Sequence, residues 1–176
     1  VPIDPRSVQL ERLVRAYPWR PTTRPGIAGP GEVQFSVTLR TGDIYNLVRE
    51  WLGPWDYDGV QIGRFKGLWT HFRMHKDHSN SRPSLAYQFG RYTNGQVFLA
   101  APSPNDPPDE CAHHRSWYVF EGRRYHWMHA VTSGTRYSII YFARGPPVDQ
   151  ATVPPPQPVP PRLLKDPSAK AATSFV

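Results

Sequence analysis

The spacing of apolar residues predicts two helices in the first third of the chain. One begins after Asp4, a helix-capping residue followed by proline, and it ends before the next proline. Its apolar positions are Leu10, Leu13, Val14 and Tyr17. A second helix is predicted over 43–52, capped by Thr41 or Asp43 and closed by Gly53. Its apolar stripe consists of Ile44, Leu47, Val48, Trp51 and Leu52.

The rest of the chain has the pattern of closely spaced strands. Alternating apolar positions predict a strand at 33–39, ahead of the second helix. Further strand-like runs lie at about 67–77, 84–90, 95–101, 115–120, 124–131 and 135–143. Turn-forming pairs such as Asn94-Gly95 and Ser133-Gly134 separate them, with a turn expected at 132–135. The order predicts an α+β, mainly β fold: a double-stranded β-helix (jelly roll) with N-terminal helices packed on one face.

Proline is concentrated near the end of the chain. The stretch 145–161 reads GPPVDQATVPPPQPVPP, and proline fixes φ and lacks a backbone donor. We therefore expect one jelly-roll domain over 1–144 and an extended Pro-rich tail over 145–176. Such a tail can bind another protein as a polyproline ligand.

Composition narrows the surroundings and the partners. The formal net charge of +7 favours anionic partners such as DNA or RNA; the alternative is a soluble basic protein with no such partner. A single cysteine, Cys111, excludes an internal disulfide and indicates a reducing, intracellular compartment, the nucleus being one choice. No run approaches the roughly 18 apolar residues of a membrane span, so no membrane partner is expected.

Two short segments carry candidate metal ligands. His75 and Asp77 lie two apart, and residues two apart on a strand point to the same side, while Lys76 points away. His126 supplies a second imidazole. His129 is its rival, but on an extended segment the two face opposite sides. Two histidines and one carboxylate form the facial triad of non-haem iron(II) oxygenases.

Other histidines offer weaker alternatives. His113 and His114 are expected to be exposed beside a Pro-rich loop, and with Cys111 they do not complete a tetrahedral zinc set. His71 and His78 flank the first ligand pair and are expected to face away.

Arg136 and Ser138 lie on an apolar strand that looks buried. A buried arginine needs an anionic partner, and its planar fork fits a carboxylate through two parallel hydrogen bonds. Ser138 can add a hydroxyl donor on the same face.

These segments resemble the 2-oxoglutarate and iron(II)-dependent dioxygenases. HKDHSNSRPS, from His75 to Ser84, is similar to their H-x-D-x-x-N-x-x-x-S element, and His126 is followed ten residues later by R-Y-S. The nearest members that the pattern resembles are the small TET/JBP-like dioxygenases of algae and protists. The resemblance implies Fe(II) as the cofactor and 2-oxoglutarate and O2 as cosubstrates. It also implies that Arg136 and Ser138 bind 2-oxoglutarate. It also makes Asn80 either a group that orients a ligand or a turn cap.

The substrate divides into two classes. A nucleic-acid base, such as a methylated pyrimidine, fits the basic charge. Aromatic residues such as Trp69, Tyr92 and Trp127 could stack a base if they are exposed; the alternative is that they belong to the core. A protein side chain is the alternative, since prolyl hydroxylases share the same ligand layout. A third, non-enzymatic alternative is a basic nucleic-acid-binding module on a jelly-roll scaffold.

Overall fold

A computed structural model describes residues 3–20, 35–53, 57–66, 74–77, 79–145 and 174–175. The helices are α1 (Pro5–Arg15) and α2 (Asp43–Leu52). The strands are β1 (Phe35–Leu39), β2 (Gly59–Lys66), β3 (Ser84–Phe89), β4 (Tyr92–Asn94), β5 (Val97–Leu99), β6 (Asp109–Cys111), β7 (Tyr118–Phe120), β8 (His126–Met128), β9 (Val131–Phe142) and β10 (Ser174–Phe175).

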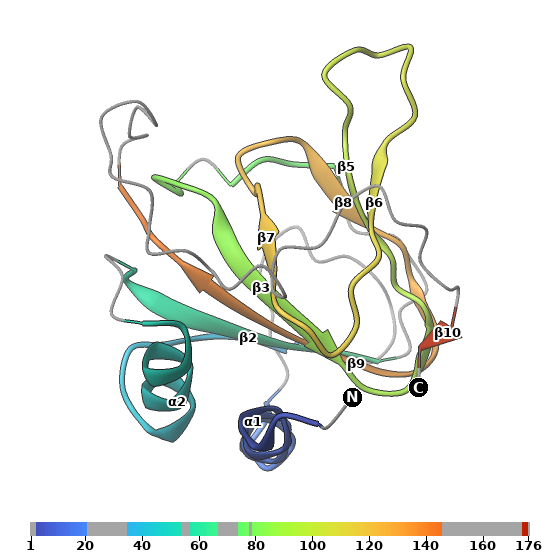
Figure 1. Cartoon of the computed structure of the whole chain (residues 1–176). Helices are drawn as coiled ribbons and strands as arrows, with labels where there is room; N and C mark the ends of the chain where they lie inside the picture. Colours follow the sequence, from blue (N-terminus) through green and yellow to red (C-terminus); the bar gives the residue numbers. More distant parts are fainter. Residues whose placement is uncertain are drawn as a thin grey trace.

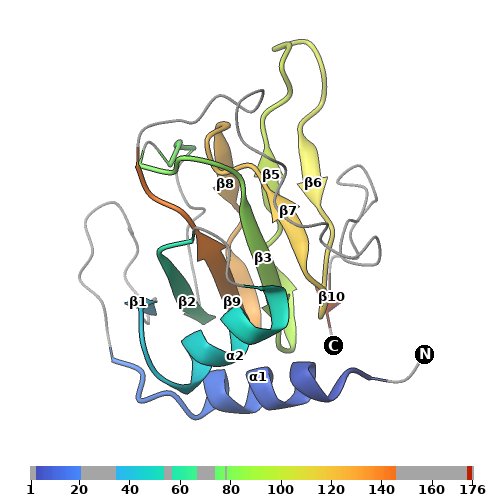
Figure 2. The same cartoon turned by 60° about the vertical axis from the view of Figure 1, so that its left-hand side comes forward.

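The strands form two antiparallel sheets. The larger has the order β1-β2-β9-β3-β7, with β4 paired to β9 and β10 paired to β4. The smaller has the order β6-β5-β8, and an isolated bridge adds His75 beside His126 at its edge. Both helices lie along one side of the larger sheet, while the smaller sheet lies on its other side (Figures 1 and 2). The predicted mainly β jelly roll with helices on one face is confirmed.

The two helices begin for different reasons. In α1, Asp4 caps the helix through its side chain, which accepts from the Arg6 amide at 2.9 Å, as predicted. In α2 the capping prediction was wrong, because Gly42 is the N-cap and no side chain caps the helix. Asp43 instead lies in the first turn, where its charge is favourable toward the helix dipole.

Alternation along β9 separates two cores. Tyr137, Ile139 and Tyr141 pack toward the helices. Arg136 and Ser138 lie on the opposite side of the strand, which faces the interior between the two sheets. The core under the helices contains Leu10, Val14, Ile44, Val48, Leu52, Val60, Ile62, Leu85, Tyr87, Phe89 and Trp117 besides those three β9 residues. The core between the sheets contains Ala86, Tyr92, Val97, Leu99, Cys111, Tyr118, Phe120, Met128, Ala130 and Val131.

Several predicted boundaries were wrong. Strand β2 was not predicted, because Gly59 and Gly63 interrupt its apolar pattern, although it lies between β1 and β9 in the larger sheet. The short strand β6 was also missed, since it follows directly on a Pro-rich loop. The turn expected at 132–135 is absent from the described chain, where β9 runs on through Gly134, whose φ is +74°.

Some predictions fall on residues that the structure does not describe. Of the run at 67–77, only 74–77 is described, and it holds one isolated bridge at His75 rather than a strand. Trp69, His71 and His78 lie outside the described residues, as do 146–173 of the predicted tail. Over the described ranges, neither helix has the length and apolar character needed to cross a bilayer.

Candidate metal centre

The structure brings His75, Asp77 and His126 together at the mouth of the jelly roll. The two histidines exchange backbone hydrogen bonds of 3.0 and 2.9 Å, and their rings are 4.3 Å apart at an angle of 58°. Asp77 Oδ1 lies 3.7 Å from His75 Nε2 and 3.8 Å from His126 Nε2. All three ligand atoms lie within 4.8 Å of one another.

This arrangement fits a metal ion. Three donors at about 2.1 Å from a cation, mutually at right angles, lie about 3 Å apart, so each needs to move by less than about 1 Å. Within the described parts of the chain, no other group of three His, Cys, Asp or Glu side chains converges in this way. The His75 side chain is 50% exposed and that of His126 only 9%, so one side of the cluster is open to solvent. Two imidazoles and one carboxylate with an open side match an iron(II) facial triad.

The local structure presets the His126 imidazole as a ligand. Its Nδ1 lies 2.8 Å from the Arg124 carbonyl oxygen, which fixes the proton on Nδ1 and leaves the Nε2 lone pair facing Asp77. Burial lowers the pKa of His126, against the opposing effects of the Arg124 carbonyl and the Asp77 charge. His126 is therefore held in the neutral form that binds metals.

Asp77 depends on a glycine that the sequence did not single out. Its backbone N–H donates to the Gly122 carbonyl at 2.8 Å. A Cβ at Gly122 would lie 2.4 Å from Asp77 Oδ2, closer than any unbonded carbon and oxygen come. Asn80 Nδ2 lies 3.4 Å from the same Oδ2, and the Asn80 amide donates to the Asp77 carbonyl at 3.3 Å. Asn80 thus both closes the turn and contacts the carboxylate.

The competing histidines lie elsewhere. His129 stacks beside Phe98, with ring centroids 4.6 Å apart, and is not part of the cluster. His113 is buried against Tyr118 at 4.4 Å, so the prediction that it is exposed was wrong. The reason is that the chain between β6 and β7 is hydrogen-bonded to β3: the Gln88 side-chain amide donates to the His113 carbonyl, and the Arg115 amide donates to the Gln88 carbonyl at 2.8 Å.

Arg136 lies in the interior between the sheets, 3% exposed. Its Nη2 donates to Gln88 Oε1 at 2.6 Å, and the same oxygen accepts from the Tyr118 hydroxyl at 3.2 Å. Arg136 Nε is buried without a hydrogen-bond partner, and no carboxylate of the described chain pairs with this guanidinium. Ser138 stands opposite Gly63 on β2, whose missing side chain leaves room for the hydroxyl.

Strand β7 links the arginine to the metal ligands. The Phe120 ring lies 5.0 Å from the His126 ring, and Tyr118, two residues earlier on the same face, contacts Gln88. The metal cluster and Arg136 therefore lie at two ends of one interior wall. Gln88, Tyr118, Gly63 and Gly122 all shape this wall, and sequence reasoning missed all four.

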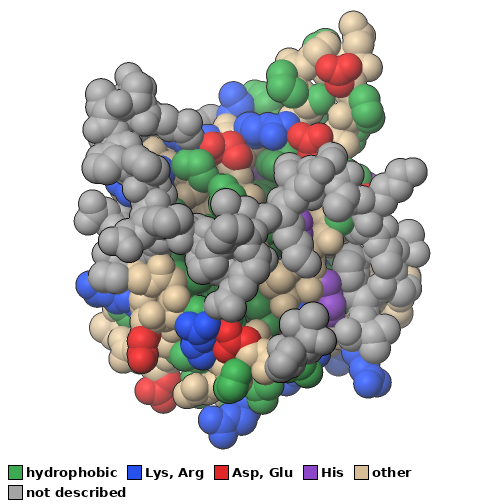
Figure 3. Space-filling view, viewed as in Figure 1, with side chains coloured by type: hydrophobic (Ala, Val, Ile, Leu, Met, Phe, Trp, Pro, Cys, Tyr) green, Lys and Arg blue, Asp and Glu red, His purple; other side chains and the backbone are tan. Residues whose placement is uncertain are grey.

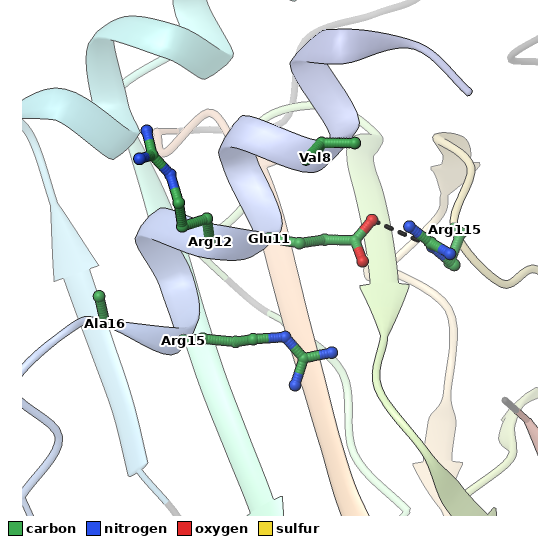
Figure 4. A pocket seen from close by; sticks show the side chains of 6 residues that line it. All are labelled: Val8, Glu11, Arg12, Arg15, Ala16 and Arg115. Carbon is green, nitrogen blue, oxygen red and sulfur yellow. Dashed lines mark hydrogen bonds and ion pairs between the residues drawn. The ribbon is translucent and has the colours of Figure 1, made fainter. Parts of the chain in front are cut away.

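A separate hollow of about 520 Å³ lies beside α1 (Figure 4). Glu11 is its one carboxylate, and it is already bonded to the Tyr87 hydroxyl at 2.7 Å and to Arg115 Nε at 3.1 Å. Arg15 stacks over Phe89, 5.1 Å from the ring centroid. These groups hold α1 on the larger sheet, so we assign this hollow a structural role.

The aromatic surface predicted to stack a base is only partly present in the described chain. Tyr92 is buried at 3% exposure, which contradicts its predicted exposure, and Trp127 is half-buried on Phe98 at 5.6 Å. Three of the arginines near the site in sequence pair with carboxylates: Arg115 with Glu11, Arg123 with Glu121 and Arg124 with Asp109. On the face in Figure 3, Lys and Arg are scattered among Asp and Glu rather than gathered in one patch.

Comparison with known proteins supports the fold. No protein-family model and no curated protein sequence matches the chain. An oxidoreductase of the 2OG-Fe(II) oxygenase family from Burkholderia pseudomallei superposes with a TM-score of 0.53 at 15% identity, covering 81% of each chain. A prolyl-4-hydroxylase from Pseudomonas putida gives 0.51 at 11% identity, covering 80% of this chain and 84% of that one. NgTET1 in complex with 5mC DNA matches half of this chain and 34% of its own, with a TM-score of 0.35 that carries no argument.

The predicted resemblance to the 2-oxoglutarate and iron(II)-dependent dioxygenases is therefore matched at the level of the fold. The chain folds as the oxygenases of this superfamily do, and the placement within its TET/JBP-like branch stays a prediction.

Proposed function

We propose that this protein is an Fe(II)- and 2-oxoglutarate-dependent dioxygenase that hydroxylates a macromolecular substrate. The observation that carries the proposal is the convergence of His75, Asp77 and His126 within 4.8 Å, inside the fold shared with 2OG-Fe(II) oxygenases. These three residues would hold the iron. Bound iron(II) supplies oxidative chemistry in which 2-oxoglutarate and O2 become succinate and CO2 while a substrate C–H becomes C–OH.

Arg136 and Ser138 would bind the far carboxylate of 2-oxoglutarate. A buried arginine without a carboxylate partner in the described chain is costly unless a ligand supplies the anion. We place one small dicarboxylate between the metal cluster and Arg136, because Phe120 on β7 contacts His126 and Tyr118 on the same strand contacts Gln88, the acceptor of Arg136. Phe120 and Tyr118 keep that wall apolar and dry, which strengthens the ion pair.

The open side of the cluster gives the substrate its approach. His75 is the exposed ligand, whereas His126 is shielded by Phe120, so the interior side suits the cosubstrate. Lys76 lies 4.4 Å from the centroid of the Tyr125 ring, which is 49% exposed, and both residues are next to ligands in sequence. They place a cation and an aromatic ring beside the exposed side of the metal cluster.

For the substrate we propose a nucleic-acid base, with methylated pyrimidine oxidation as the reaction. The net charge of +7 and the Lys76–Tyr125 pair support it, because phosphates attract cations and bases stack on rings. The alternative substrate is a protein side chain, as in a prolyl-type hydroxylase. The second alternative is a non-catalytic, basic nucleic-acid-binding module that binds no iron. An intracellular location and a protein partner for the Pro-rich tail stay predictions.

The test begins with iron and ends with the substrate. Anaerobic Fe(II) titration should show one site, and His75→Ala, Asp77→Ala and His126→Ala should each abolish it. His129→Ala is the matched control, since His129 lies on the same segment outside the cluster and should bind iron normally.

Succinate release is then measured with single-stranded methylated DNA and with a proline-rich peptide. Stimulation by DNA supports the base and stimulation by the peptide supports the protein substrate. Wild-type protein that binds no iron would refute the enzyme and leave the binding module.

A further inference from the structure

The acceptor that holds Arg136 is uncharged, although a carboxylate is the usual partner of a buried arginine. Gln88 on β3 is 2% exposed and faces Arg136 across the sheet interior, with Ser138 as its direct partner on β9. Its Oε1 accepts from Arg136 Nη2 at 2.6 Å. This bond fixes the guanidinium without cancelling its charge.

The orientation of the Gln88 amide follows from its other contacts. Its Nε2 donates to the His113 carbonyl, which can only accept, so Oε1 must face Arg136. The Tyr118 hydroxyl donates to the same Oε1 at 3.2 Å. Both amide ends are therefore committed, and the side chain has one position.

Three further groups that interact with Arg136 are also neutral. They are the Tyr92 phenol, which hydrogen-bonds to Arg136, the Tyr118 phenol and the Cys111 thiol. Burial raises the pKa of each of the three, so all stay protonated at neutral pH. Within the described residues, the interior thus supplies Arg136 with dipoles and no counter-charge.

We infer that Gln88 is the positioning residue of the carboxylate pocket, and that its neutrality reserves the charge of Arg136 for an anionic ligand. This inference rests on the proposed function, because that ligand is the far carboxylate of 2-oxoglutarate. A glutamate at position 88 would form an internal ion pair with Arg136 and so neutralise the charge that binds the ligand. The specificity for a dicarboxylate therefore depends on one amide.

Two substitutions separate charge from shape. Gln88→Glu keeps the size and the acceptor and adds an internal carboxylate, and Gln88→Leu removes the acceptor and leaves Arg136 charged; both variants lose the donor to the His113 carbonyl. We expect Gln88→Glu to raise the Kd for 2-oxoglutarate about 100-fold, and Gln88→Leu only about 10-fold. A merely structural role predicts the reverse order, because only Leu leaves the Tyr118 hydroxyl and Arg136 Nη2 without their acceptor, while both variants lose the bond to the His113 carbonyl.

Binding is measured by titrating the Mn(II)-loaded protein with 2-oxoglutarate and, separately, with succinate. The Mn(II) Kd of each variant, expected within about threefold of wild type, shows that the metal end is intact. Wild-type binding of 2-oxoglutarate with equal losses in both variants, or a larger loss for Leu, overturns the Gln88 inference and leaves the proposed function standing. Wild-type binding of succinate but not 2-oxoglutarate, again lost in Gln88→Glu, overturns the cosubstrate and retains Gln88. Wild-type protein that binds neither overturns both.

Discussion

Replacing Gly122 by alanine should displace a metal ligand without touching the metal. The added Cβ would lie 2.4 Å from Asp77 Oδ2, whereas an ordinary carbon–oxygen contact is about 3.3 Å, so the carboxylate must retreat by about 1 Å. The φ of Gly122 is not positive, so alanine itself fits the backbone. Disturbing the support of a metal ligand typically lowers affinity about 10- to 100-fold, or about 1.4 to 2.8 kcal/mol.

The assay is anaerobic titration of the apoprotein with Fe(II), or with Co(II) followed by its absorbance. Gly63→Ala is the matched control, because its Cβ would press on Ser138 Oγ and the Phe65 ring, each at 2.8 Å, at the other end of the wall. It should weaken 2-oxoglutarate binding and leave metal affinity within about twofold. Equal metal affinity in Gly122→Ala and wild type would show that Asp77 is not a ligand in this geometry.

Further results are expected for Cys111, Glu11 and Ser138. Burial raises the pKa of Cys111 to about 12, so at pH 8 native protein should react with iodoacetamide about 1000-fold more slowly than unfolded protein; fast native labelling would contradict this. Because the unfolded thiol ionises near its ordinary value of 9.0, Cys111 contributes stability that is complete below pH 9 and is lost as the pH rises toward 12. Glu11→Leu removes the acceptor of the buried Tyr87 hydroxyl and the partner of Arg115, and should lower the free energy of unfolding by about 2 kcal/mol in a urea titration with no change in metal affinity. Ser138→Ala should raise the Kd for 2-oxoglutarate about threefold to tenfold in calorimetry, as loss of one hydrogen bond does, and an unchanged Kd would exclude the hydroxyl from the pocket.

The parts of the fold that could be predicted are those determined by residues close together in the sequence. The Asp4 cap and the apolar stripe of α2 follow from the local sequence. Strand alternation predicted that His75 and Asp77 share one side, and the structure brings them together although only an isolated bridge forms at His75. The choice of His126 over His129 came from its distance to Arg136 along the chain. In the structure His126 is the one that reaches the cluster.

What could not be predicted depends on contacts between distant segments. Gly122 looks like an ordinary turn glycine until Asp77 is placed beside it, and Gln88 looks like one polar residue on an apolar strand. Strand β2 was missed for a related reason. Gly63 breaks its apolar pattern, and the need for a glycine there is visible only once Ser138 Oγ and the Phe65 ring are seen to fill the space beside it. His113 was expected at the surface because it lies beside a Pro-rich loop, yet tertiary packing buries it against Tyr118.

The two histidine ligands stand on neighbouring segments that are joined at this point by one isolated bridge. A cation held by both would therefore cross-link the segment of His75 to strand β8, and metal binding would stabilise the pairing of these two segments. The apparent affinity for the ion then includes the free energy of ordering the His75 segment against β8. A substitution that weakens this pairing should lower the metal affinity, even when it lies far from the ligand atoms.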